Sequence, residues 1–86
     1  MSKNIIVTKS FAFAVRIVKL YEYLKKGKQE FVLAKQVLRS GTSIGANVEE
    51  AVAGQSAADF IHKLSIARKE SRETSYWLML FMRQAI

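Results

Sequence analysis

Apolar residues recur at helical spacing in three segments, and the chain contains no proline. The pattern predicts three helices, over residues 9–26, 30–52 and 57–85. Thr8 is the predicted N-cap of the first helix, and Gly27 is its predicted left-handed stop. Ser56 and Asp59 fit a capping-box-like start of the third helix. We therefore predict an all-α fold in which residues 1–86 form a single helical-bundle domain.

The apolar positions of each predicted helix form stripes that indicate how the helices pack. The first helix carries two adjacent stripes: Phe13, Ile17, Leu20 and Leu24, and Phe11, Ala14, Val18 and Tyr21. The second and third helices alternate steps of four and three: Val37, Gly41, Ile44, Val48 and Ala51, and Phe60, Leu64, Ala67, Ser71, Thr74, Leu78 and Phe81. This alternation is the heptad spacing of a helix bundle. The width of the first helix's apolar face predicts contact with more than one neighbour.

Two glycines lie four residues apart within the predicted second helix. Each glycine costs a helix interior roughly 0.5 to 1 kcal/mol relative to alanine. Gly41 and Gly45 therefore indicate a close approach by another helix. The middle of the third helix's stripe is small and polar, so we expect Ser71 and Thr74 to face the two glycines.

Length and composition limit the classes of protein to consider. A chain of 86 residues buries only about 60 to 65% of its unfolded surface, so its stability is marginal unless chains associate. The absence of cysteine excludes disulfides, thiol nucleophiles and cysteine-ligated metals. The sequence has neither an apolar run long enough for a membrane span nor a signal-peptide pattern. We expect a cytoplasmic protein with no membrane partner.

Positive charge is concentrated at the N-terminal end. The net charge of the chain is +7, and residues 1–28 alone hold seven Lys or Arg against one acid. Four basic residues share one side of the predicted first helix: Lys9, Arg16, Lys19 and Lys26. This basic side is either an ordinary solvated face or a surface that contacts nucleic-acid phosphates.

Polar side chains also follow the packing stripes. On the third helix, Glu70 and Glu73 lie between apolar residues such as Trp77, so they should be half-buried and in need of partners. The candidate partners by pattern are Arg39, Arg68 and Arg72. A second polar stripe on the second helix contains Gln36, Ser40, Ser43, Asn47 and Glu50. These positions predict hydrogen bonds to another helix, to another subunit or to water.

Catalytic and metal-binding interpretations are weak. The only histidine, His62, is eight residues before Glu70, which does not fit the Glu-x-x-His pattern of di-metal bundles. The segment GTSIGAN has no preceding strand and no following Gly-Lys-Ser/Thr, so it is not a phosphate-binding loop. We therefore predict no catalytic residue, no metal and no cofactor, and we interpret the carboxylates as part of an ion-pair network.

The run QVLRSGTSIGANVEEAVAGQSAADFIHKLSIARKESRETSYWL, residues 36–78, resembles the bacterial 23S rRNA intervening-sequence proteins. The segment KSFAFAVRIVKLYEYL, residues 9–24, is similar to that family's first helix. The resemblance implies an antiparallel four-helix bundle that assembles into ring-shaped homopentamers. It also places one set of residues at the family's helix-packing and interface positions: Arg39, Gly41, Gly45, Asn47, Glu70, Glu73 and Trp77.

The resemblance also implies partners. The family is named for genes inside insertions of ribosomal RNA, and relatives are accessory subunits of retroelement reverse transcriptases. The expected activity is therefore binding of RNA or DNA, and the alternative is a protein-interaction scaffold whose partner is a reverse transcriptase or another protein. The family has a fourth helix after the third, whereas this chain ends at Ile86. We expect residues 76–82 to be left uncovered, unless another copy covers them or the chain belongs to a longer protein.

Overall fold

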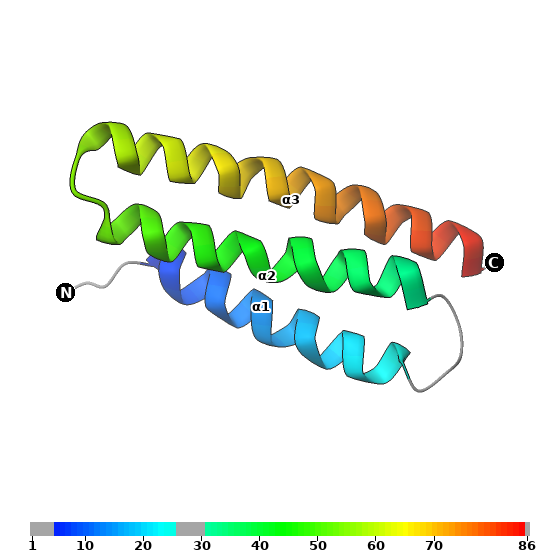
Figure 1. The fold of residues 1–86 in the computed structure, drawn as a ribbon. Helices are drawn as coiled ribbons and strands as arrows, with labels where there is room; N and C mark the ends of the chain where they lie inside the picture. Colours follow the sequence, from blue (N-terminus) through cyan, green and yellow to red (C-terminus); the bar gives the residue numbers. More distant parts are fainter. Residues whose placement is uncertain (1–4, 26–30, 86) are drawn as a thin grey trace.

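The computed structural model describes residues 5–25 and 31–85, and it gives side-chain surroundings for residues up to 83. Three helices make up its regular structure: α1 (Ile5–Leu24), α2 (Phe31–Ala53) and α3 (Ala57–Ala85). Consecutive helices run in opposite directions, and α2 lies between α1 and α3 (Figure 1). The predicted all-α fold, an antiparallel helix bundle with three helices in this chain, is confirmed.

The first helix begins four residues earlier than predicted. It starts at Ile5, so Thr8 lies inside its first turn and is not the N-cap. The reason is that the apolar side continues toward the N-terminus, since Ile6 and Ser10 lie at helical spacing from Phe13 and line the same groove as that residue. The predicted stop at Gly27 lies outside the described residues.

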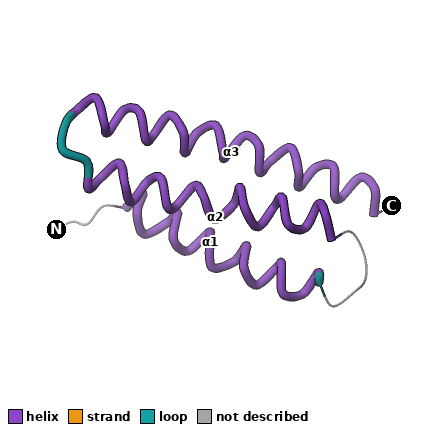
Figure 2. Tube along the Cα trace, in the orientation of Figure 1, coloured by secondary structure: helices purple, strands orange, loops and turns teal. Residues whose placement is uncertain are grey.

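The third helix begins at Ala57, as its capping pattern indicates. The backbone N–H of Asp59 donates to the Ser56 Oγ at 3.1 Å, which satisfies one of the free donors of the first turn. Gly54, Gln55 and Ser56 form the short connection from α2 (Figure 2). This short connection keeps α2 and α3 together as an antiparallel pair.

The central position of α2 explains its composition. Both α1 and α3 pack against α2, and within the described residues their backbones do not approach each other. α2 is therefore buried on two sides, at Ala34, Val37, Ser40, Gly41, Gly45, Val48 and Ala51. Among the side chains that the structure describes, α1 buries Ser10 and Ile17, and α3 buries Ala67 and Thr74. The prediction that α1 contacts several neighbours is wrong for this chain by itself, and Phe11, Phe13 and Val18 remain exposed.

Gly41 and Gly45 face α1, not α3. A Cβ atom on Gly41 would lie 2.9 Å from the Ile17 Cγ1, and one on Gly45 would lie 3.1 Å from the Ser10 carbonyl oxygen. The close approach inferred from the two glycines is therefore present, but its partner is α1. The expectation that Ser71 and Thr74 face the glycines is wrong, because Ser71 is exposed and Thr74 contacts Ser40.

An apolar groove opens between α1 and α3, with α2 as its floor. Its volume is about 810 Å³, and its main apolar lining residues are Ile6, Phe13, Ile44, Val48, Leu64 and Leu78. Lys9 of α1 and Arg68 of α3 also line it. The C-terminal part of α3 is left uncovered as expected, since Tyr76, Met79 and Met82 are largely exposed. The Cα atoms extend over 44 × 22 × 15 Å, and the smallest extent is about three times the width of one helix's Cα cylinder, so the three helices do not lie in one flat layer.

Candidate functional site

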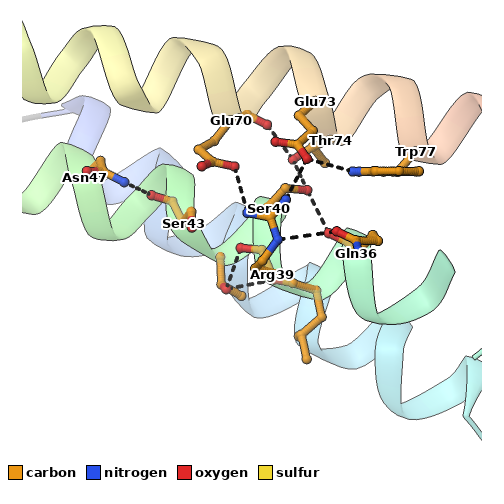
Figure 3. A network of polar contacts seen from close by, with 11 residues as sticks. Gln36, Arg39, Ser40, Ser43, Asn47, Glu70, Glu73, Thr74 and Trp77 are labelled. Carbon is orange, nitrogen blue, oxygen red and sulfur yellow. Dashed lines mark hydrogen bonds and ion pairs between the residues drawn. The ribbon is translucent and has the colours of Figure 1, made fainter. Parts of the chain in front are cut away.

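Arg39 connects α2 to α3 through two carboxylates. Its Nη1 lies 3.3 Å from the Glu70 Oε1, and its Nη2 lies 2.6 Å from the Glu73 Oε2. The Nε of the same guanidinium donates to the Gln36 Oε1 at 3.4 Å. Figure 3 shows both carboxylates reaching from α3 toward this one side chain. A planar guanidinium with five donors is suited to such multiple contacts.

In this network the two carboxylate side chains are less exposed to solvent than the arginine side chain. The side chain of Glu70 is 14% exposed and that of Glu73 is 33% exposed, whereas that of Arg39 is 49% exposed. Trp77 donates from its Nε1 to the Glu73 Oε2 at 3.2 Å, so this oxygen accepts from two side chains. The sequence reasoning named all four residues, and the structure brings them together in one network.

A second polar contact lies deeper between α2 and α3. The hydroxyl oxygens of Ser40 and Thr74 are 2.8 Å apart, and both side chains are almost fully buried. Each hydroxyl is also near a carbonyl of its own helix, Ser40 near that of Gln36 at 2.9 Å and Thr74 near that of Glu70 at 2.8 Å. Each hydroxyl has a single proton: Ser40 donates to the Gln36 carbonyl, and Thr74 donates at any one time either to the Ser40 oxygen or to the Glu70 carbonyl. The sequence places Thr74 on the packing stripe of the third helix and Ser40 on the polar stripe of the second, but it does not predict that they meet.

Two further polar contacts lie outside this network. The Asn47 Nδ2 donates to the carbonyl oxygen of Ser43 at 2.9 Å, so its amide bonds within α2 and does not bridge to α3. Nearer the connection, the Lys63 Nζ lies 2.8 Å from the Glu50 Oε1. The hydrogen bond from Lys63, followed by its positive charge, lowers the pKa of the Glu50 carboxyl.

Three of the four predicted basic positions lie on the exposed surface of α1. Lys9, Arg16 and Lys19, named here the α1 basic surface, are exposed and share one side of the helix. None of them has an ion pair with another described residue. Lys26, the fourth predicted position, lies outside the described residues. The α1 basic surface is thus a set of uncompensated charges.

Arg68 and Arg72 do not serve as partners of the carboxylates. Arg39 occupies that role, and both α3 arginines are exposed. The reason is geometric, because Arg68 and Arg72 are four residues apart on a side of α3 rotated away from Glu70 and Glu73. Their positions around α3, about 100° or more from both carboxylates, were the signal that could have excluded them as partners.

Within residues 5–25 and 31–85, no three side chains of His, Asp or Glu gather closely enough to hold a metal ion. No helix in that part of the chain has the length and apolar character to cross a membrane.

The fold and the network define a small antiparallel helical bundle whose central helix is joined to α3 by buried and half-buried polar contacts. Residues 2–86 match the family of 23S rRNA-intervening sequence proteins, and the chain belongs to that family. The resemblance seen in the sequence is thereby confirmed.

One solved structure is closely similar to the chain. It is a protein with unknown function from the S23 ribosomal protein family of Bacteroides thetaiotaomicron, with 59% sequence identity and a TM-score of 0.91. The match covers 94% of this chain and 72% of that protein, so more than a quarter of the other chain lies outside it. No curated protein matches the chain.

Proposed function

We propose that the protein is a non-enzymatic accessory protein that binds nucleic acid through phosphate contacts, with structured RNA as the first ligand. The observation that carries this proposal is the α1 basic surface. Lys9, Arg16 and Lys19 are exposed and have no ion pair with another described residue, in a chain with a net charge of +7. Unpaired surface cations attract phosphates and release the counterions that surround them.

The geometry of the α1 basic surface determines what kind of binding is expected. Residues 9 to 19 span about 15 Å of helix, which is the length of a few nucleotides. Long basic side chains on one helix contact the backbone and do not by themselves read bases, so binding should be weakly selective for sequence. The description of the family, which refers to 23S rRNA, supports RNA as the first nucleic acid to test.

Self-association belongs to the same proposal. A homo-oligomer, a pentamer by family resemblance, would multiply the α1 basic surface and strengthen binding through several contacts at once. The exposed apolar residues beside the groove support association, because monomers rarely expose large contiguous apolar areas. Sedimentation of the purified protein over a range of concentrations tests this part, and a monomer at every concentration contradicts it.

The test of binding is fluorescence anisotropy of labelled structured RNA and of duplex DNA, repeated from low to physiological salt. The variant Arg16→Gln/Lys19→Gln removes two charges of the α1 basic surface, and Lys25→Gln/Lys35→Gln removes two exposed charges elsewhere. If two phosphate contacts are lost, the negative slope of log K against log salt should become less steep by roughly 1.4 to 1.8 in the first variant. No binding of either ligand at low salt contradicts the proposal.

The second candidate is a protein-interaction scaffold, and the apolar groove favours it. A groove with an apolar floor and the cations Lys9 and Arg68 at its sides fits an amphipathic helix from another protein, such as a reverse transcriptase. This candidate predicts that RNA affinity is absent in the wild-type protein. The anisotropy experiment therefore separates the two candidates.

A further inference from the structure

The outer side of α3 carries a line of exposed basic residues that the proposed function does not use. It consists of Arg68, Lys69, Arg72 and Arg83, with the exposed ring of Tyr76 between them, and we name it the α3 basic stripe. At about 100° per residue, these five positions fall within an arc of about 100° around the helix. From residue 68 to residue 83 the stripe extends over about 22 Å.

The charges of the α3 basic stripe are not compensated within the described chain. None of its four basic residues has an ion pair with another described residue. Glu70 and Glu73 are the acidic residues interleaved with the stripe along the helix, but both turn toward Arg39 (Figure 3). The polar network therefore withdraws the nearby negative charge from the outer side of α3.

Two shallow depressions with different lining residues lie along the α3 basic stripe. Ser65, Arg68, Lys69 and Arg72 line a shallow depression of about 220 Å³, where a hydroxyl and three cationic groups converge. Tyr76, Met79, Leu80 and Arg83 line a second one of similar volume, where an aromatic ring lies among apolar side chains and one arginine. The first has the chemistry of a phosphate site, and the second has that of a base-stacking site.

The ring of Tyr76 is presented to solvent and held in place. Tyr76 is 56% exposed, and its ring packs edge-to-face on Trp77 with 5.3 Å between centroids and 69° between planes. Trp77 is itself fixed by its hydrogen bond to Glu73. A rigid aromatic surface lowers the entropy cost of stacking with a base.

We infer that the α3 basic stripe binds single-stranded RNA, with phosphates at Arg68, Lys69 and Arg72 and a base stacked on Tyr76. This inference rests on the proposed function and adds a second surface to the α1 basic surface. Unstacked bases in a single strand are free to lie on an aromatic ring, whereas bases inside a duplex are not. The aromatic ring among the cations is what favours RNA over an acidic peptide or an anionic membrane.

The test uses single-stranded RNA of mixed sequence and three variants of the whole chain. Arg68→Gln/Arg72→Gln removes two phosphate contacts, Tyr76→Leu removes the ring, and Lys25→Gln/Lys35→Gln is the charge-matched control. In the first variant the negative slope of log K against log salt should be less steep than in wild type by about 1.4. Tyr76→Leu should weaken binding about fivefold or more at every salt concentration with the slope unchanged. The control should retain the wild-type slope to within about 0.5.

The outcomes separate this inference from the proposed function. If wild type binds RNA and both α3 variants bind like the control, the inference is overturned while the proposed function stands. If wild type binds no single-stranded RNA at low salt, the inference is overturned, and if it also binds neither structured RNA nor duplex DNA, the proposed function is overturned as well. Vesicles of phosphatidylcholine and phosphatidylserine form the last arm, and binding to them without binding to RNA also overturns the inference. Because every substituted side chain is exposed, far-UV circular dichroism should show unchanged helix content.

Discussion

Replacing Arg39 by methionine tests whether the half-buried network stabilises the contact between α2 and α3. The substitution keeps an unbranched side chain but leaves Glu70 and Glu73 without their cation. Hydrogen bonds to charged groups contribute about 1.5–3 kcal/mol each when well protected. The side chain of Arg39 is 49% exposed, so solvent screens much of this contribution. We expect a loss of about 1–2 kcal/mol in the free energy of unfolding.

The measurement is thermal and urea unfolding followed by circular dichroism at a fixed protein concentration. For a chain of this size, the expected loss lowers Tm by roughly 5–15 °C. Keeping the concentration fixed matters because self-association would also shift the apparent stability. Added salt should narrow the difference between the variant and wild type, since the contact is partly open to solvent.

The matched control is the same substitution in a Glu70→Gln/Glu73→Gln background. There Arg39 has no carboxylates to neutralise, so its replacement should cost less than about 0.5 kcal/mol. An equal loss in both backgrounds would refute the reasoning, because it would assign the effect to the packing of the Arg39 stem. A single variant as stable as wild type would refute it as well.

Three further predictions follow from individual contacts. Ser40→Ala and Thr74→Val should each lower the free energy of unfolding by about 1 kcal/mol. The double variant should lose clearly less than the sum of the two, because it leaves no hydroxyl without its cross-helix partner. Additive losses in urea unfolding would contradict this. Gly45→Val should lower stability by at least about 2 kcal/mol, since even its Cβ would lie 3.1 Å from the Ser10 backbone oxygen, and Ala46→Val at an exposed neighbouring position is the control. The folded-state pKa of Glu50 is lowered from its ordinary value of 4.5, so the Lys63 contact should stabilise the fold above that pH and lose its effect as the pH falls through the lowered pKa. NMR titration of Glu50 in wild type and in Lys63→Gln checks this last prediction, and an unchanged pKa in the variant would exclude Lys63 as the cause.

Periodicity predicted one buried side of α2 well, because a heptad spacing of apolar and small residues marks the side of a helix that packs. Val37, Gly41, Val48 and Ala51 are buried as their heptad spacing indicates. Periodicity did not identify the partner of Glu70 and Glu73, because three arginines fitted the pattern. The rotation of each helix about its own axis determines that Arg39 makes the contact. Sequence spacing gives the side of one helix but not the neighbour that it faces.

The glycine pair also shows that sequence spacing does not identify the neighbouring helix. Gly41 and Gly45 correctly indicated a close helix contact, yet α1 and α3 were both available as partners. The small polar residues of α3 suggested the wrong one. The start of α1 was also missed, because Thr8 is a good cap by type and the apolar side nevertheless continues through Ile6.

The middle position of α2 has a consequence for the order in which the molecule opens. Because the backbone of α1 approaches that of α2 and not that of α3, α1 can detach while the α2–α3 hairpin keeps its hydroxyl pair and its ion pairs. Backbone amides of α1 should therefore exchange with deuterium through a local opening of low free energy, and those in the middle of α2 only through global unfolding. The bundle therefore consists of an α2–α3 hairpin and a first helix that can separate from it, and that first helix carries the α1 basic surface.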